Sequence, residues 1–108
     1  MRKSSNGSAE FEPLEGGRSR IVGPLDFSTV TRLLPRGAAA IAQGRAAVID
    51  LAGVTHSDSS ALALLIEWLS LARDSQHPLR YENMPAQLQQ LARLSEVDDL
   101  LIARSQAV

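Results

Sequence analysis

Residues 46–65 read AAVIDLAGVTHSDSSALALL, which is an apolar run, a polar stretch and the beginning of a second apolar run. The nearly continuous apolar segment Ala46–Leu51 predicts a strand that is buried on both faces, as strands of parallel sheets usually are. The polar stretch Gly53–Asp58 predicts a loop. A helix is predicted from Ser59 to about Ser75, and Asp58 has the type of side chain that caps the start of a helix.

Two short strands are predicted upstream, at Glu10–Leu14 and Arg18–Val22. The segment Glu15-Gly16-Gly17 joins them, and its glycine pair favours a hairpin turn. Residues 1–9 are small and polar and predict a flexible tail, so the expected single domain spans residues 10–108.

A first helix is predicted after this hairpin, with Asp26 or Ser28 as its cap. Pro35 and Gly37 fall inside it and predict a kink or a division into two unequal pieces. Its apolar residues are Phe27, Val30, Leu33, Leu34 and Ile41.

Three further elements are predicted downstream: a strand at Leu79–Glu82, a third helix opened by Pro85, and a last apolar turn at Val97–Leu101. The resulting order is β-β-α-β-α-β-α, and its crossovers are long enough for right-handed βαβ units. We therefore expect an α/β fold: a small mixed sheet with parallel interior strands and an antiparallel edge hairpin, packed by about four helices.

The composition of the chain argues against several classes of function. The chain has 108 residues, a formal net charge of −1 and no cysteine, which excludes disulfides, cysteine-ligated metal sites and a cysteine nucleophile. A near-neutral balance without a basic patch argues against nucleic acid as a partner. The longest apolar stretch, Ala61–Ile66, is far shorter than the ~20 residues that span a bilayer, and no signal peptide is evident. The sequence thus predicts a cytoplasmic protein without direct membrane insertion.

The stretch around Asp58 contains residue types found in catalytic and metal sites. His56, Asp58 and the neighbouring serines invite comparison with a catalytic triad, but residues two apart in one short loop rarely reach that geometry. His56 and His77 lack acidic residues at ligand spacing, so no metal or other cofactor is expected. Catalysis is not expected, and His56 is interpreted as part of a binding surface.

Asp58, Ser59 and Ser60 occupy the first turn of the predicted second helix, where backbone N–H groups lack partners. The partial positive charge of a helix N-terminus can hold an acidic cap or an added phosphate. The carboxyl end of a parallel strand is also where open α/β sheets commonly place function. Two interpretations stay open: a helix cap alone, or a functional site.

The second helix has a wider apolar surface than a surface helix needs. One stripe is assigned to the sheet and consists of Leu62, Leu65, Ile66, Leu69 and Ala72. A second row consists of Ala61, Leu64, Trp68 and Leu71. Two alternatives are open for this second row. Either neighbouring helices bury it in the core, or Leu64, Trp68 and Leu71 are partly exposed and contact a partner. The tryptophan favours the second alternative, because tryptophan is enriched in binding hot spots.

The segments Ile49–Val54 and Asp58–Leu65 together resemble the signature of STAS domains, the family of sulfate-transporter tails and SpoIIAA-type anti-sigma factor antagonists. Gly23–Asp26 resembles the family's Gly-x-Leu-Asp element, and the likeness covers roughly Glu10–Leu101. Within the family the chain is most similar to MlaB-type subunits. That resemblance implies the SpoIIAA-like fold and a non-enzymatic subunit that binds a MlaF-like ABC transporter ATPase, in a complex with a permease that maintains outer-membrane lipid asymmetry. It also implies association with the inner membrane through that complex.

The resemblance implies two roles that differ by one residue. The functionally important Thr of MlaB-type proteins falls on Ser59, whereas the phosphorylated Ser of SpoIIAA-type proteins falls on Ser60. Both groups usually have Gly at the next position, where this chain has Ala61. The alternative function is an antagonist switched by an anti-sigma factor kinase at Ser60, with Ser59 as the second candidate. The partner-binding residues expected overall are Thr55, His56, Asp58, Ser59, Ser60, Leu64, Trp68 and Leu71.

Overall fold

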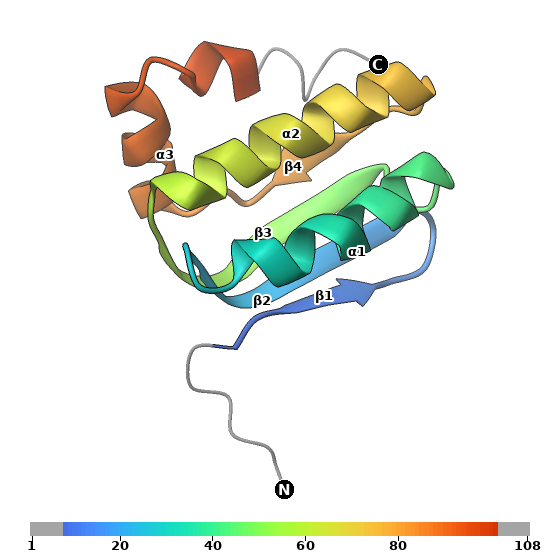
Figure 1. Cartoon of the computed structure of the whole chain (residues 1–108), viewed down its shortest axis with the longest axis horizontal. Helices are drawn as coiled ribbons and strands as arrows, with labels where there is room; N and C mark the ends of the chain where they lie inside the picture. Colours follow the sequence, from blue (N-terminus) through green and yellow to red (C-terminus); the bar gives the residue numbers. More distant parts are fainter. Residues whose placement is uncertain (1–7, 102–108) are drawn as a thin grey trace, which may run out of the picture.

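The computed structural model describes residues 8–101 and has the predicted order of elements (Figure 1). The strands are β1 (Glu10–Pro13), β2 (Arg18–Leu25), β3 (Val48–Ser57) and β4 (Arg80–Glu82). The helices are α1 (Val30–Ala42), α2 (Ser59–Ser75) and α3 (Ala86–Leu94), followed by helical residues 98–101. Most of the expected tail, residues 1–7, and residues 102–108 lie outside the described part, whereas Ala9 is buried in the core.

The four strands form one sheet in the order β1-β2-β3-β4. β1 pairs antiparallel with β2, whereas β2–β3 and β3–β4 are parallel pairs. Gly16 and Gly17 form the turn of the β1–β2 hairpin with φ values of 70° and 76°, a region that glycine enters without steric cost. The predicted mixed sheet with an antiparallel edge hairpin is therefore confirmed.

Strand β3 is longer than the sequence predicts. The predicted loop Gly53–Asp58 is wrong, because the strand continues to Ser57. β2 also continues to Leu25, so Leu25 lies opposite Ser57 and the two strands stay paired across two register shifts. Gly53 permits this close approach, since a Cβ there would lie 2.9 Å from the carbonyl oxygen of Ile21. Residues 53–57 belong to the strand because their backbone pairs with β2. The side-chain pattern of this polar stretch does not indicate a strand.

Helices α1 and α2 lie side by side on one face of the sheet (Figure 1). α1 is one continuous helix, so the predicted division into two pieces is wrong, although Pro35 lies inside it. It also begins later than predicted, after Thr29, so neither Asp26 nor Ser28 is its N-cap. The largest fully buried side chains include Ile21, Leu25, Leu33, Ile41, Ile49, Leu51, Leu65 and Trp68.

Three residues of the second apolar row of α2, Ala61, Leu64 and Trp68, are buried. Of the two alternatives, burial therefore holds for Leu64 and Trp68, and their partial exposure is wrong. Trp68 is 0% exposed, and its indole nitrogen donates a hydrogen bond to the carbonyl oxygen of Leu34 in α1 at 3.1 Å. A Cβ at Gly37 would overlap the indole ring, so glycine is what lets α1 approach α2 this closely. Phe11 packs edge-on against the same indole, with the two ring centroids 5.8 Å apart.

Other members of the two apolar rows follow the prediction more closely. Leu62, Leu65, Leu69 and Ala72 are buried as expected for the stripe on the sheet. Ile66 and Leu71 are only half-buried and pack against the edge of the core. Most apolar side chains of α2 therefore pack against the sheet and against α1.

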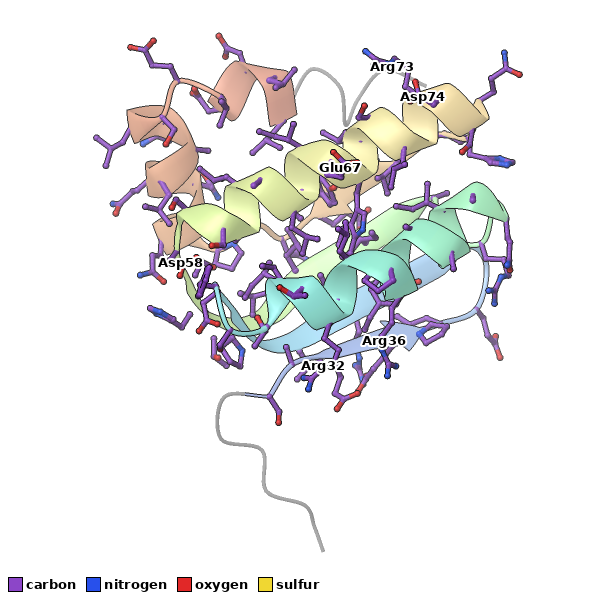
Figure 2. The ribbon with its side chains drawn as sticks, viewed as in Figure 1. Arg32, Arg36, Asp58, Glu67, Arg73 and Asp74 are labelled. Carbon is purple, nitrogen blue, oxygen red and sulfur yellow. The ribbon has the colours of Figure 1, made fainter. Side chains whose placement is uncertain are left out.

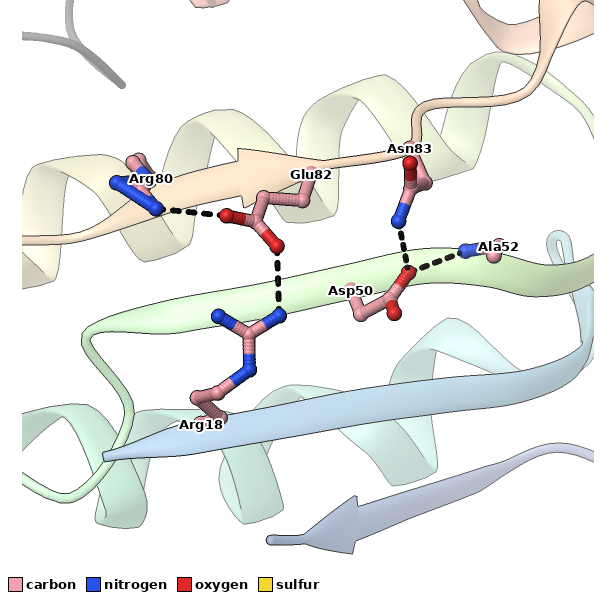
Figure 3. Close-up of polar contacts among 6 residues, drawn as sticks. All are labelled: Arg18, Asp50, Ala52, Arg80, Glu82 and Asn83. Atoms are coloured by element: carbon pink, nitrogen blue, oxygen red, sulfur yellow. Dashed lines mark hydrogen bonds and ion pairs between the residues drawn. The ribbon is translucent and has the colours of Figure 1, made fainter. Parts of the chain in front are cut away.

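The other face of the sheet carries a charged network (Figure 3). Arg18 and Arg80 each place a guanidinium nitrogen 2.6 Å from a carboxylate oxygen of Glu82. Asp50 accepts hydrogen bonds from the side chain of Asn83 at 3.1 Å and from the backbone of Ala52 at 2.9 Å. These polar groups are matched to each other, which suits a sheet face that none of the helices within residues 8–101 covers.

Candidate functional site

Several segments meet where β2 and β3 end and α2 begins. The backbone N–H of Asp58 faces the carbonyl oxygen of Leu25 at 3.4 Å, which joins the two strand ends. Asp58 lies at this end of the molecule, far from Arg73 and Asp74 at the other end of α2 (Figure 2). We call this region the Asp58 surface; it consists of Asp26, Phe27, Ser28, Thr55, His56, Asp58, Ser59, Ser60 and Gln87.

Asp58 connects two segments through its two carboxylate oxygens. Oδ1 accepts a hydrogen bond from the backbone N–H of Ser60 at 2.8 Å, which confirms the predicted cap of α2. Oδ2 accepts a hydrogen bond from the backbone N–H of Phe27 at 3.1 Å. One side chain therefore caps a helix and also holds the β2–α1 turn against it.

The β2–α1 turn has its own hydrogen bonds. Oδ1 of Asp26 accepts from the backbone N–H of Ser28 at 2.9 Å and from its hydroxyl at 2.7 Å. The hydroxyl of Thr29 accepts from the backbone N–H of Asp26 and donates to the carbonyl oxygen of Pro24, both at 3.0 Å. Such side-chain bonds to nearby backbone groups fix turns.

The same contacts control the charge of Asp26. The hydrogen bonds from Ser28 lower the pKa of Asp26, and the nearby His56 lowers it further, against a smaller opposing effect of desolvation. Asp26 is therefore ionised at neutral pH. The Asp58 surface carries this negative charge in the turn next to Phe27.

Helix α3 contributes to the site through Gln87, whose side-chain oxygen accepts a hydrogen bond from the backbone N–H of Ser57 at 3.1 Å. Ser57 itself is buried, and among the described residues its hydroxyl has no hydrogen-bond partner. The end of β3 is thus fixed by β2 on one side and by α3 on the other.

The structure brings together five of the eight predicted partner-binding residues. Thr55, His56 and Ser59 are exposed, whereas Asp58 and Ser60 are half-buried. The other three, Leu64, Trp68 and Leu71, belong to the buried or half-buried side of α2 and not to this surface.

Four residues of the Asp58 surface are not among the predicted partner-binding residues: Asp26 and Ser28, which the sequence offered only as alternative helix caps, and Phe27 and Gln87. Phe27 was assigned to the apolar side of the first helix, but it lies in the turn before that helix and is 80% exposed. Its position between Asp26 and Ser28, two turn-forming residues, is a sequence signal that could have placed it there. Gln87 gave no such signal, because its partner Ser57 lies 30 residues away.

The described residues also limit what else the site holds. Within residues 8–101, no three His, Asp or Glu side chains are grouped closely enough to bind a metal ion. None of the helices in the same range is long and apolar enough to cross a bilayer.

Solved structures with a similar fold include SpoIIAA in two forms. The Bacillus cell fate determinant SpoIIAA in its phosphorylated form matches with a TM-score of 0.62 and 18% identity, over 82% of this chain and 83% of that chain. The anti-sigma factor antagonist SpoIIAA in its unphosphorylated form matches with a TM-score of 0.60 and 16% identity, over 94% of this chain and 100% of that chain. At such identities the likeness shows the fold, and the predicted SpoIIAA-like fold is confirmed.

Comparison with curated proteins gave no match. The family model STAS_2, described as "Mlab, STAS domain", matches residues 13–103 and so covers nearly the whole described fold. The Asp58 surface lies entirely inside the matched range. The chain therefore belongs to the STAS domain family, in the group that this model describes as Mlab.

Proposed function

We propose that this protein is a non-enzymatic STAS subunit that binds the ATPase of an ABC transporter for phospholipids. In this proposal the ATPase and a permease form one complex, which maintains outer-membrane lipid asymmetry, and the subunit lies on the cytoplasmic side of the inner membrane. The observation that carries the proposal is the match to the Mlab family model over residues 13–103.

The geometry of the Asp58 surface supports a role in binding. Exposed Thr55, His56 and Ser59 lie around a carboxylate that fixes two segments, so the surface has little freedom to lose when a partner binds. Ser59, at the position of the functionally important Thr of MlaB-type proteins, is exposed at the start of α2.

Affinity purification from the native cell tests this proposal. The bait is the full chain, and mass spectrometry of the eluate should find an ABC ATPase together with a permease. Ser59→Arg should abolish their recovery because it places a large charged side chain on the Asp58 surface. Asp74→Arg is the matched control, since it places the same side chain at an exposed position near the other end of α2.

Recovery of the transporter subunits by the wild type and by Asp74→Arg, but not by Ser59→Arg, supports the proposal. An eluate that contains an anti-sigma factor kinase and no ABC ATPase contradicts it. Equal recovery by all three baits would mean that the ATPase binds elsewhere on the chain.

The second candidate function is an anti-sigma factor antagonist switched by phosphorylation, and the fold shared with SpoIIAA in both forms favours it. Ser60 would be the modified residue. It is half-buried, and Asp58 holds its backbone N–H at the start of α2. A phosphate there would add about −1.5 to −2 charges next to a carboxylate.

Incubation of the protein with extract of the native cell and ATP, followed by intact mass measurement, separates the two candidates. A stoichiometric phosphate mass shift that Ser60→Ala removes and Ser59→Ala leaves in place favours the switched antagonist. Absence of modification under conditions where the ATPase is recovered favours the transporter subunit.

A further inference from the structure

Phe27 is an exposed aromatic side chain on a fixed backbone. Its side chain is 80% exposed, while its backbone N–H is held by Asp58 at 3.1 Å. The turn around it is closed by hydrogen bonds from the backbone N–H groups of Thr29 and Val30 to the carbonyl oxygen of Asp26, each at 3.0 Å. A rigid aromatic residue loses little conformational entropy on binding, which is why such residues are enriched in the centres of interfaces.

The acidic side chains closest to Phe27 carry the negative charge of this region. His56 lies here too, and the nearest arginine along the chain, Arg32, donates a hydrogen bond to the carbonyl oxygen of Ala9 at 3.2 Å. Three segments carry the residues of the Asp58 surface: residues 24–31, 53–61 and 83–90. Their only Asp or Glu residues are Asp26 and Asp58, and they contain no Lys or Arg, although the whole chain has 11 Lys+Arg against 12 Asp+Glu. Asp26, whose pKa is lowered further from its ordinary acidic value, is negatively charged at neutral pH.

Phe27 is also separated from the other strongly exposed apolar side chain. Leu94 is 83% exposed, but it is the last residue of α3, about 10 Å along that helix from Gln87 at the site. Leu94 shares no described hydrogen bond with the Asp58 surface, whereas Phe27 is bonded to Asp58 directly.

We propose that Phe27 is the anchor of the Asp58 surface and that it enters an apolar pocket of the partner bordered by Arg or Lys side chains. This inference rests on the proposed function, so the pocket belongs to the ABC ATPase. The apolar side chain would supply most of the contact, and the carboxylates of Asp26 and Asp58 would attract the basic border.

Binding of the purified MlaF-like ATPase from the same organism to the immobilised full chain tests the inference. Phe27→Ala should weaken the equilibrium affinity by more than about thirtyfold, as removal of a hot-spot side chain does. Leu94→Ala removes an apolar side chain of similar exposure and should change the affinity by less than about twofold. Far-UV circular dichroism and the melting temperature should be unchanged in both variants, because both side chains are exposed.

The association rate tests separately whether Arg or Lys side chains border the pocket of the partner. Raising NaCl from 50 to 500 mM should slow association of the wild type at least about fivefold, since charges are screened beyond about 10 Å already at 0.1 M salt. Phe27→Ala should keep this salt dependence, because it leaves Asp26 and Asp58 in place.

The outcomes separate the inference from the proposed function. If the wild type binds the ATPase and Phe27→Ala binds equally well, the anchor is wrong and the proposed function stands. If the wild type does not bind the ATPase at all, both are wrong. An association rate that does not depend on salt overturns the basic border.

Discussion

The first turn and the middle of α2 differ in whether their side chains are exposed or buried. Its first turn, with Asp58 as cap and Ser59 exposed, lies on a surface that is fixed by hydrogen bonds. Its middle, with Leu64 and Trp68, is buried against α1 and β1. From the sequence, residues of both regions were candidates for partner binding. The difference shows that a wide apolar face predicts a contact, but the contact can be with another chain or with a helix of the same chain.

The two regions differ in burial because the middle of α2 has another segment of the chain packed against it. The missing side chain of Gly37 leaves room for the Trp68 indole against α1, and the carbonyl oxygen of Leu34 accepts a hydrogen bond from the indole N–H. Around Asp58, by contrast, the hydrogen bonds satisfy backbone groups and leave side chains such as Phe27 outside. The first region should therefore control stability, and the second should control binding.

The largest effect is expected from Trp68→Ala, which should lower the free energy of unfolding by about 3–5 kcal/mol because it leaves a cavity and an unused carbonyl between α1 and α2. Urea denaturation followed by circular dichroism measures the loss. Leu94→Ala is the control and should cost less than about 0.5 kcal/mol. A folded Trp68→Ala variant of wild-type stability would mean that the indole is not buried, which would remove the contrast between the two regions.

The next effect concerns Gly37. Replacement of glycine by alanine inside a helix usually stabilises by about 0.5–1 kcal/mol. Here the new methyl group would overlap the Trp68 ring, so Gly37→Ala should instead destabilise by about 1–3 kcal/mol. The melting temperature gives the sign. A stabilised Gly37→Ala protein would show that the two helices have room between them.

A smaller loss of stability is expected at the other region. Asp58→Ala removes the α2 cap and the bond to Phe27, and should cost about 1–2 kcal/mol. Asp58→Asn keeps an acceptor oxygen and should cost less. Asn has one acceptor oxygen where Asp58 has two, so it can keep only one of the two hydrogen bonds. If the Asn variant is as unstable as the Ala variant, a single acceptor does not hold the turn and both carboxylate oxygens are needed.

The smallest effect concerns the open face of the sheet. Hydrogen bonds from Arg18, together with the charges of Arg18 and Arg80, lower the pKa of Glu82, so the folded state binds a proton less readily than the unfolded chain. The stabilisation is therefore present above the ordinary pKa of glutamate, about 4.3, and is lost as the pH falls through the lower pKa of the folded state. Because these ion pairs are partly exposed to solvent, the effect should be slight.

Melting temperatures measured from pH 7 to pH 3 test this pH dependence. Glu82→Gln should flatten the fall of the melting temperature below about pH 4.3, because the group that takes up the proton is gone. Glu67→Gln, on the exposed face of α2, is the control and should leave the pH profile unchanged. Identical profiles for both variants would show that the network around Glu82 does not contribute.

Much of the candidate site could be predicted because its signals are local. Asp58 precedes an apolar run at capping distance, and the structure confirms the cap with its bond to Ser60. For Phe27 the flanking residues Asp26 and Ser28 indicate a turn, but its contact with Asp58 joins residues 31 apart and could not be predicted from them. The pairing of β2 with the end of β3 is equally distant, so Thr55 and His56 read as loop residues when they are strand residues.

The sequence by itself determined the order of the elements, the Gly16-Gly17 hairpin turn and the start of α2, since each follows from residues close together in the chain. The mixed sheet follows from that order, because the crossovers are long enough for parallel pairs. Only the tertiary structure decided that Trp68 belongs to the core and Phe27 to the surface. Both side chains are large and apolar, and their burial depends on what lies opposite them. Gly37 leaves space for the indole, whereas Phe27 in the β2–α1 turn is left exposed by the part of the chain that the structure describes. Burial is a property of packing between distant segments, which local pattern does not encode.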